Sequence, residues 1–480
     1  MLERRRDRTK ILATLGPATG TRARLKELVK AGADAVRLNM SHGDAANTRR
    51  WAGLVRSVRR ELNRPVSILV DLRGPRIRLG TMSEPRLLKR GEIVGVVSHT
   101  HAKDGDLPID YLRLLGDVGP GQRILVRDGR VELKVMRRIG VRLICKVLRG
   151  DIVSSNQGVN LPDSEVSETA LSVKDRADVR LAVEIKADWI ALSFVRTADD
   201  VKALRRELSR LGSKIPIVSK IEHPQALEHL DGIIEESDAV MIARGDLAVE
   251  VGHALVPTIQ KRIVSACIQK ATPVIVATQM LESMLEAAQP TRAEVSDVAN
   301  AVLDGVDAVM LSGETAVGKF PIETCRTMRE IIHETEKGLF HDTWRLRPNL
   351  QPAGKKGQVL ESATMDSAVT LAQRAQARTL LAFTESGRSV RLVSAFRARL
   401  PIVALTSSEE TFQQMALYWG VLPGRLPRVK RIREMNREAH RLLRQHKLLG
   451  DQDLLVVVTG TFAVSGATNT VRLIRLADLT

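Results

Sequence analysis

Aromatic side chains are scarce in this sequence and make up 3% of its 480 residues. Proteins that bind single-stranded nucleic acids stack bases on aromatic rings, so this scarcity argues against such a function despite the formal net charge of +18. The densest basic run, at 425–447, has apolar residues at helical spacing and fits an amphipathic helix with a solvated basic face. A positive field also suits a polyanionic substrate or effector. We therefore expect no nucleic-acid partner.

Cysteine is also scarce, and long apolar runs are absent. Cys145, Cys267 and Cys325 lie far apart and form no CxxC or zinc-binding spacing, which is typical of reduced structural thiols. No run of 18 apolar residues is present, so no membrane span is expected. The basic N-terminus is not followed by an apolar segment of signal-peptide length. These absences predict a cytoplasmic protein with no membrane partner.

The sequence instead shows a regular alternation of short apolar runs and amphipathic segments. Eight runs have the length and composition of strands, at 10–15, 34–39, 67–72, 188–194, 215–221, 238–243, 273–278 and 307–312. Their nearly continuous apolar character predicts parallel strands that are buried on both faces. The fold class expected is therefore α/β, with a (β/α)8 TIM barrel at its centre.

Two further domains are expected beside the barrel. Residues 79–173 interrupt the repeat with turn signals and short alternating runs, which predicts an inserted all-β lid domain. The barrel would then comprise 1–78 and 174–345. A polar segment rich in Pro and Gly at 346–359 is typical of a linker, and renewed β/α alternation over 360–480 predicts a C-terminal open-sheet α/β domain.

The predicted strands carry polar residues at their C-terminal ends, where barrel enzymes place their active sites. Glu222 and Asp246 are two carboxylates without a neighbouring Cys or His pair, a set that suits Mg²⁺ or Mn²⁺. The alternative is that both form structural ion pairs. Lys220 shares strand parity with Glu222, so both side chains are expected on one face. A lysine beside a metal ligand, with arginines across the mouth, favours phosphoryl-transfer or enolate chemistry.

Several stretches resemble the pyruvate kinase family, and together they extend over essentially the whole chain. They are TKILATLGPAT, VRLNMSHG, DLRGPRIR, SKIEH, ARGDLAVEVG, TESGRS and the long run 277–316. The run 277–316 is too specific for a chance match. The resemblance implies a barrel with a mobile β lid and a C-terminal effector domain. It also implies phosphoryl transfer from phosphoenolpyruvate to ADP, giving pyruvate and ATP in the last step of glycolysis.

The resemblance implies roles for individual residues. The catalytic positions match Lys220, Arg37 and Thr278, and the divalent-metal ligands match Glu222 and Asp246. Ala243, Arg244 and Gly245 match the turn around the substrate carboxylate. The full substrate-binding set consists of Arg37, Lys220, Ala243, Arg244, Gly245, Asp246, Thr278 and Ser193. The nucleotide-side positions match Asn39, His42, Arg78 and Lys174, the last of which is a lid-hinge lysine.

A monovalent-cation site departs from the common family pattern. Many members hold K⁺ with groups matching the side chains of Asn39, Ser41 and Asp71 and the backbone carbonyl of Leu72. Those members carry an acidic residue where this chain has Arg76. A guanidinium there would supply the positive charge that K⁺ otherwise brings, so we predict that K⁺ is not required. The alternative is that Arg76 is a surface arginine facing ADP.

The C-terminal domain carries a loop that resembles the family's phosphate-binding effector loop at a helix N-terminus. It consists of Thr384, Glu385, Ser386, Gly387, Arg388 and Ser389. Glu385 stands where members activated by fructose 1,6-bisphosphate often carry a lysine, and the final loop at 459–470 lacks the Trp and Arg of some such members. A monophosphate effector, AMP or a sugar monophosphate, is therefore predicted. The family also implies a homotetramer.

Two other functions remain open. One is another metal-dependent phosphoenolpyruvate or pyruvate barrel enzyme, such as a lyase or aldolase, which would share the metal carboxylates but give no reason for Lys220 or the lid. The other is a non-enzymatic basic binding protein on an inactive barrel. That function predicts that catalytic residues have been replaced. None is missing here among Arg37, Lys220, Glu222, Asp246 and Thr278.

Overall fold

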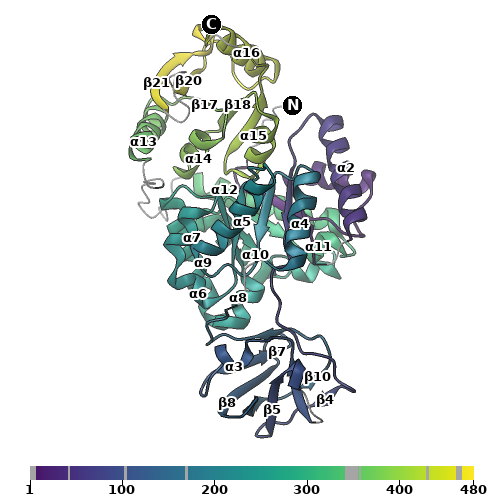
Figure 1. Ribbon diagram of the computed structural model, residues 1–480. Helices are drawn as coiled ribbons and strands as arrows, with labels where there is room; N and C mark the ends of the chain where they lie inside the picture. Colours follow the sequence, from purple (N-terminus) through teal and green to yellow (C-terminus); the bar gives the residue numbers. More distant parts are fainter. Residues whose placement is uncertain are drawn as a thin grey trace.

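The computed structural model describes residues 7–41, 44–101, 105–167, 171–340, 355, 358–428, 432–460 and 468–479. Three bodies follow one another along the long axis of the molecule (Figure 1). The barrel lies in the middle, the inserted β domain below it and the C-terminal domain above it, beside the N-terminus. Within the described residues, no helix is long and apolar enough to cross a bilayer.

The central body is a closed barrel of parallel strands in the order β1-β16-β15-β14-β13-β12-β3-β2. Its strands are β1 (Lys10–Thr14), β2 (Ala35–Asn39), β3 (Ser67–Asp71), β12 (Trp189–Leu192), β13 (Ile217–Ile221), β14 (Ala239–Ala243), β15 (Val274–Ala277) and β16 (Ala308–Leu311). Every strand predicted from an apolar run is present and ends within two residues of its predicted C-terminal end. The predicted (β/α)8 barrel is therefore confirmed.

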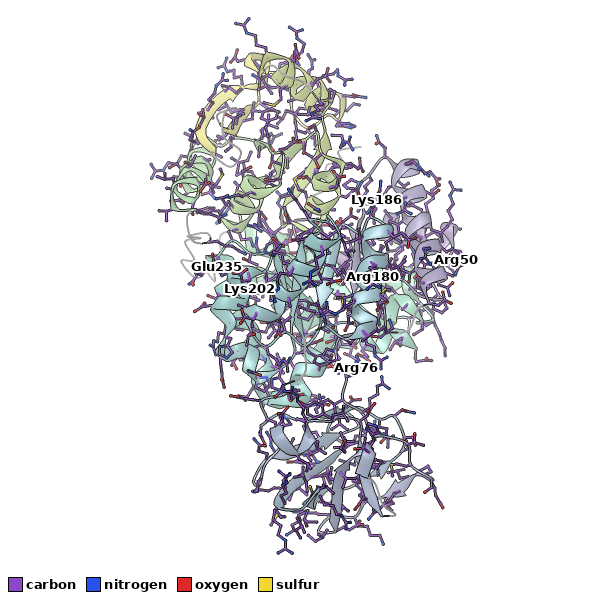
Figure 2. All side chains as sticks on the ribbon, viewed as in Figure 1. Arg50, Arg76, Arg180, Lys186, Lys202 and Glu235 are labelled. Carbon is purple, nitrogen blue, oxygen red and sulfur yellow. The ribbon has the colours of Figure 1, made fainter. Side chains whose placement is uncertain are left out.

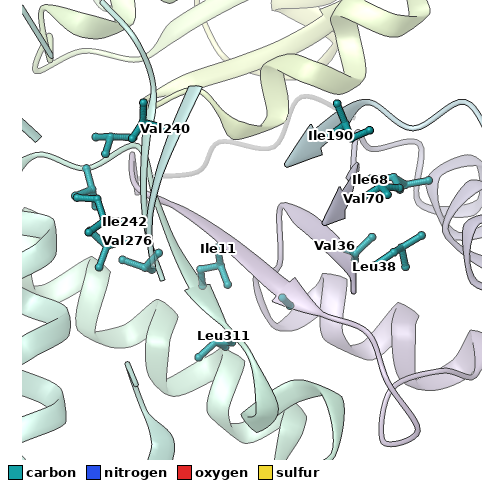
Figure 3. Close-up of a cluster of buried hydrophobic side chains, with 14 of the residues drawn as sticks. Ile11, Val36, Leu38, Ile68, Val70, Ile190, Val240, Ile242, Val276 and Leu311 are labelled. Atoms are coloured by element: carbon teal, nitrogen blue, oxygen red, sulfur yellow. The ribbon is translucent and has the colours of Figure 1, made fainter. Parts of the chain in front are cut away.

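Helices surround the barrel and bury one apolar stripe each against the outer faces of the strands. They include α1 (Arg22–Ala31), α2 (Ala45–Leu62), α4 (Val173–Glu184), α5 (Ala198–Arg210), α9 (Val256–Gln269), α10 (Arg292–Asp304) and α12 (Pro321–Phe340). Alternate strand residues such as Val36, Ile68 and Val240 point outward into this layer and are fully buried (Figure 3). The packed layer fixes the strand ends, and with them the polar side chains of the mouth.

The inserted domain is built mainly of β-strands, as predicted, with one short α-helix, α3 (Leu114–Asp117), and has its own hydrophobic core. Its main sheet runs β11-β7-β8-β9-β5-β6, with a separate pair β10-β4. The strands are β4 (Arg86–Leu87), β5 (Ile93–Ser98), β6 (Asp106–Ile109), β7 (Arg123–Val126), β8 (Val131–Ile139), β9 (Arg142–Arg149), β10 (Ile152–Val153) and β11 (Val159–Asn160). Because this core is separate from that of the barrel, the domain is a distinct body placed after strand β3.

The C-terminal domain has an open sheet in the order β19-β18-β17-β20-β21. Its strands are β17 (Thr379–Phe383), β18 (Ile402–Thr406), β19 (Val421–Arg425), β20 (Leu454–Gly460) and β21 (Thr468–Arg475), and its helices include α13 (Val359–Arg374), α14 (Arg388–Ala395) and α16 (Ile432–Gln445). The helix predicted in the basic run is α16. The antiparallel edge strand β21 had not been predicted.

A buried ion pair joins the C-terminal domain to the barrel. Arg397 donates to Asp307 at 2.7 and 3.2 Å and to the carbonyl of Gly305 at 2.8 Å, and its guanidinium lies 5.3 Å from the ring centre of Trp419. Asp307 precedes β16 and also accepts the backbone N–H of Val274 at 2.9 Å. One carboxylate therefore holds both a barrel strand and the C-terminal domain.

Arg397→Met is expected to lower the melting temperature by several degrees. The substitution leaves the buried Asp307 carboxylate without its cation, and breaking a buried pair in this way costs about 3–5 kcal/mol. Differential scanning calorimetry measures the shift. The matched control is Arg374→Met, which removes an exposed arginine of α13. Equal melting temperatures for the two variants would contradict the assigned importance of the pair.

Candidate active site

Lys220 is the centre of a buried charge cluster at the mouth of the barrel. Its Nζ lies 2.9 Å from Glu222 Oε1 and 3.4 Å from Asp71 Oδ1, and it donates a hydrogen bond to Ser193 Oγ at 2.8 Å. Lys220 occupies the penultimate position of β13, and Glu222 follows that strand, so the expected common face is confirmed by their contact. Ser193 in turn donates to the carbonyl of Leu72 at 2.8 Å.

The opposite charges of this cluster stabilise one another and offset the cost of burial. Burial disfavours the Lys220 ammonium, but the carboxylates of Asp71 and Glu222 outweigh it and raise the pKa of the lysine. Burial also opposes the Asp71 carboxylate, yet Lys220 and Arg37 keep its pKa below the ordinary value. The ammonium is therefore charged at neutral pH and is held in one position at the mouth.

Arg37, on strand β2, adds a second positive charge to the cluster at the barrel mouth. It emerges from β2 and donates through Nε to Asp71 Oδ2 at 2.6 Å, with a longer contact of 3.3 Å to Thr14 Oγ1. From sequence, Asp71 was assigned only to a monovalent-cation site. In the structure, the same carboxylate pairs with both Arg37 and Lys220. This link was missed because β3 and β13 are separated by β12 in the barrel, and no sequence spacing reports that neighbourhood.

Glu222 and Asp246 have the character of a divalent-cation site. Glu222 is 1% exposed, and burial, together with the nearby charge of Asp246, raises its pKa despite the opposing effect of Lys220. Glu222 Oε2 accepts the backbone N–H of Phe194 at 2.7 Å, and Oε1 lies 2.9 Å from Lys220 Nζ. A buried carboxylate beside a second carboxylate offers the oxygen ligands that Mg²⁺ or Mn²⁺ prefers.

The protein would supply only part of the coordination sphere of such an ion. Among the described residues, no three His, Cys, Asp or Glu side chains gather in a possible metal site. The remaining positions would therefore belong to water and substrate oxygens, which is the usual arrangement for Mg²⁺ at phosphate-transfer sites.

The turn from β14 into α8 (Arg244–Val251) presents backbone groups to the mouth. The Gly245 N–H donates to Thr278 Oγ1 at 2.8 Å, so these two predicted substrate-binding residues lie side by side. Thr278 and Gln279 have φ values of 68° and 54°, an unfavourable conformation for residues with a side chain. Strain of this kind is concentrated at functional sites.

Arg244 faces away from the mouth. Its guanidinium contacts Asp297 at 2.7 Å and donates to the carbonyl of Thr278 at 2.9 Å. Its side chain therefore braces the strained turn, and only its backbone, with that of Ala243, is placed beside Gly245. The sequence pattern had located the turn but not the direction of this side chain.

The predicted nucleotide-side residues lie around the junction with the inserted domain. Lys174, at the start of α4, donates to the carbonyl of Met40 at 2.9 Å, and Arg78 donates to the carbonyl of Asn156 at 3.0 Å. Asn39 Oδ1 accepts the backbone N–H of Ser41 at 3.0 Å. His42 lies outside the described residues. Arg76 is exposed between the barrel and the inserted domain (Figure 2).

A cavity of about 100 Å³ lies between the inserted domain and the barrel mouth. Its walls include Arg76 and Asn160 on one side and His223, Asp246 and Glu250 on the other. The inserted domain therefore lies over the candidate metal site as a lid, with a partly open cavity between the two domains.

The predicted effector loop precedes α14 in the C-terminal domain. Gly387 has φ 76° and donates to Thr384 Oγ1 at 2.9 Å, which gives the loop a tight turn. Glu385 is exposed, and its carboxylate accepts from Ser407 Oγ at 3.0 Å. Arg388 pairs with Glu361 at 3.0 Å, Ser386 is exposed and Ser389 is buried. Most of the final loop, 461–467, lies outside the described residues.

Comparison with known proteins agrees with this geometry. The family model described as pyruvate kinase, barrel domain, matches residues 6–325, and the one described as pyruvate kinase, alpha/beta domain, matches 362–474. The chain is 41% identical to a pyruvate kinase of Corynebacterium glutamicum over 479 residues, covering 98% of each protein. It is 40% identical to a pyruvate kinase of Mycobacterium tuberculosis over 476 residues, covering 98% of this chain and 99% of the relative.

A solved structure gives the same result. The crystal structure of a pyruvate kinase from Cryptosporidium parvum aligns with a TM-score of 0.90 at 31% sequence identity, covering 98% of this chain and 96% of the other. The similarity thus includes the barrel, the lid and the C-terminal domain together. A lyase or aldolase barrel and an inactive binding protein do not account for it. The chain belongs to the pyruvate kinase family of phosphotransferases.

Proposed function

We propose that the chain transfers the phosphoryl group of phosphoenolpyruvate to ADP and releases ATP and pyruvate, as the last step of glycolysis in the cytoplasm. The bond between phosphorus and the enol oxygen breaks, a bond to the terminal phosphate oxygen of ADP forms, and the enolate left behind takes up a proton. The observation that carries the proposal is the buried Lys220 ammonium, which Asp71 and Glu222 hold at the barrel mouth beside Arg37.

The family resemblance implies a role for each residue. Lys220 and Arg37 would stabilise the charge that spreads over the phosphoryl oxygens during transfer. The backbone of Ala243, Arg244 and Gly245 would bind the substrate carboxylate, and Ser193 would orient Lys220. Thr278, whose Oγ lies beside that turn, would take part in proton delivery to the enolate. Asn39, His42, Arg78 and Lys174 would contact the nucleotide.

Glu222 and Asp246 would hold Mg²⁺ or Mn²⁺, which when bound neutralises phosphate charge and aligns the substrate oxygens. The nearby charge of Asp246, which together with burial raises the pKa of Glu222, is the feature of this chain that supports the assignment.

A coupled assay tests the activity. With phosphoenolpyruvate, ADP and Mg²⁺, we expect equal amounts of pyruvate and ATP, and no product after the metal is removed with a chelator. Titration with Mn²⁺ should restore the reaction. Failure to form pyruvate and ATP under any of these metal conditions would refute the proposal.

K⁺ is not required in this proposal. The groups that would ligate K⁺ already have partners within the protein: Asp71 pairs with Arg37, the Leu72 carbonyl accepts from Ser193, and Asn39 accepts from Ser41. Arg76 adds a positive charge nearby, and its charge helps to lower the pKa of Arg78 after the larger effect of burial. The built-in guanidinium would take over the electrostatic role of the ion.

We also propose regulation by a monophosphate, AMP or a sugar monophosphate, at Thr384–Ser389. The N-terminus of α14 favours an anion, while the exposed Glu385 carboxylate disfavours a second phosphate. We expect AMP or a sugar monophosphate to lower the half-saturating phosphoenolpyruvate concentration several-fold, and fructose 1,6-bisphosphate to have no effect. Glu385→Lys should introduce a response to the bisphosphate. Equal kinetics with and without all of these phosphates would exclude an effector at this loop.

The oligomer that we propose is a homotetramer. The edge strand β21 has Leu473 39% exposed, and Val359 and Leu360 at the start of α13 are 71% and 84% exposed. An unpaired edge strand beside exposed apolar side chains is a surface that a second copy can cover.

A further inference from the structure

Helix α8 touches both the substrate-binding turn and the lid. Its first turn carries Gly245 and Asp246, and its last turn carries Val249 and Glu250. Residues four apart lie on the same face of a helix and about 6 Å apart along its axis. Asp246 and Glu250 accordingly line the same cavity under the lid. Because α8 spans only Arg244–Val251, a shift of its last turn would also move its first turn.

The lid contacts the last turn of α8 at two places. Asn160, the final residue of β11, donates through Nδ2 to Glu250 Oε1 at 2.7 Å. Gly129, in the turn between β7 and β8, lies so close that a Cβ added there would sit 3.8 Å from Val249 Cγ1. In Figure 1, α8 is at the lower end of the barrel, next to the lid.

Burial of the Glu250 carboxylate at this position costs free energy. It is 6% exposed, and its second oxygen, Oε2, is buried without a hydrogen-bond partner in the described part of the chain. Burial and the charge of Asp246 raise the pKa of Glu250 to about 7, although Asn160 lowers it. A buried carboxylate that forms one hydrogen bond contributes little to stability. Its single described partner is on a different domain, which indicates a role in holding that domain.

We propose that the Asn160–Glu250 hydrogen bond latches the lid to α8, and that through this helix lid closure positions Gly245 and Asp246 for the substrate and its metal. Glu250 and Asn160 are thus positioning residues for the transfer step. The proposal rests on the proposed phosphoryl-transfer function for its kinetic consequences. The contact between lid and helix can be measured independently of turnover.

Spin labels report the position of the lid. Cysteines replacing exposed Met136 on the lid and exposed Ser209 on α5 provide label sites, while the three native cysteines are buried. Asn160→Ala and Asn160→Asp should shift the distance distribution to longer and broader values, more so for aspartate, which places a carboxylate against Glu250. Lys134→Ala, an exposed lid residue, is the control and should leave the distribution unchanged.

A double variant tests the pairing itself. Asn160→Asp with Glu250→Gln exchanges donor and acceptor while keeping one carboxylate, and it should restore the short distances. In steady-state assays, Asn160→Asp should raise KM for phosphoenolpyruvate about tenfold, the scale of one hydrogen bond to a charged group, and the double variant should recover most of that loss.

Unchanged distances in Asn160→Asp, or a double variant as open as the single one, would overturn the latch. A wild-type chain that shows the closed distances but forms no pyruvate would refute the proposed function and leave the latch in place.

Discussion

Replacing Lys220 with methionine is expected to reduce kcat by about three orders of magnitude or more. The ammonium is the charge that would face the transferring phosphoryl group, and removing one preorganised charge of this kind costs a factor of about 10³. Methionine fills a similar volume, so the strand packing is kept. The coupled assay with saturating substrates measures the loss, and KM for ADP should change little.

The same substitution has a measurable effect on the metal site. Without Lys220, the Asp71 and Glu222 carboxylates lose the cation that opposes the cost of burial, so the pKa of Glu222 should rise further. Binding of Mn²⁺, followed by electron paramagnetic resonance, should weaken. Lys202→Met, on the outer helix α5, is the matched control for both assays. A Lys220→Met enzyme within tenfold of wild-type kcat would contradict the assigned role.

Arg76→Glu is expected to make the enzyme dependent on K⁺. In a buffer whose only monovalent cations are organic, the variant should lose about tenfold to a hundredfold in kcat/KM, the scale of inverting one charge beside a partly buried anionic site. Added K⁺ should restore most of the activity. The wild-type chain should be equally active with and without K⁺.

Two control variants distinguish the effect of the charge of residue 76 from the effect of its location. Arg76→Leu should give an intermediate loss, since it removes one charge rather than inverting it. Arg50→Glu places the same inversion on α2, away from the lid (Figure 2), and should have no effect. Wild-type activity that vanishes without K⁺, or an Arg76→Glu variant indifferent to K⁺, would show that Arg76 is only a surface arginine.

Much of the fold could be predicted because the strands of a parallel barrel are buried on both faces. Their apolar runs stand out from the amphipathic helices between them, and this periodicity located all of the barrel strands. Strand β19 escaped because Pro423 and Gly424 interrupt it, and β21 because edge strands need no continuous apolar run. A strand with neither a continuous apolar run nor a clear alternation is hard to recognise from composition.

The active site was predictable as a set of residues but not as a network. Strand parity alone indicated that Lys220 and Glu222 share a face, and their contact at 2.9 Å agrees with it. The partnership of Asp71 with Lys220 depends on the order of strands around the barrel, which no local spacing encodes. The direction of the Arg244 guanidinium depends on Asp297, more than fifty residues away.

The order of strands in the barrel also constrains how the chain folds during synthesis. Strand β1 pairs with β16, which places Lys10 opposite Ala308. Strand β3 pairs with β12, which follows the whole lid in the sequence. The edge of β3 therefore stays unpaired until β12 emerges, and the edge of β1 stays unpaired until β16 emerges, when nearly two thirds of the polypeptide has been made. Contacts so distant in sequence form slowly, and exposed strand edges aggregate. Nascent chains of this protein therefore expose unpaired strand edges through much of their synthesis.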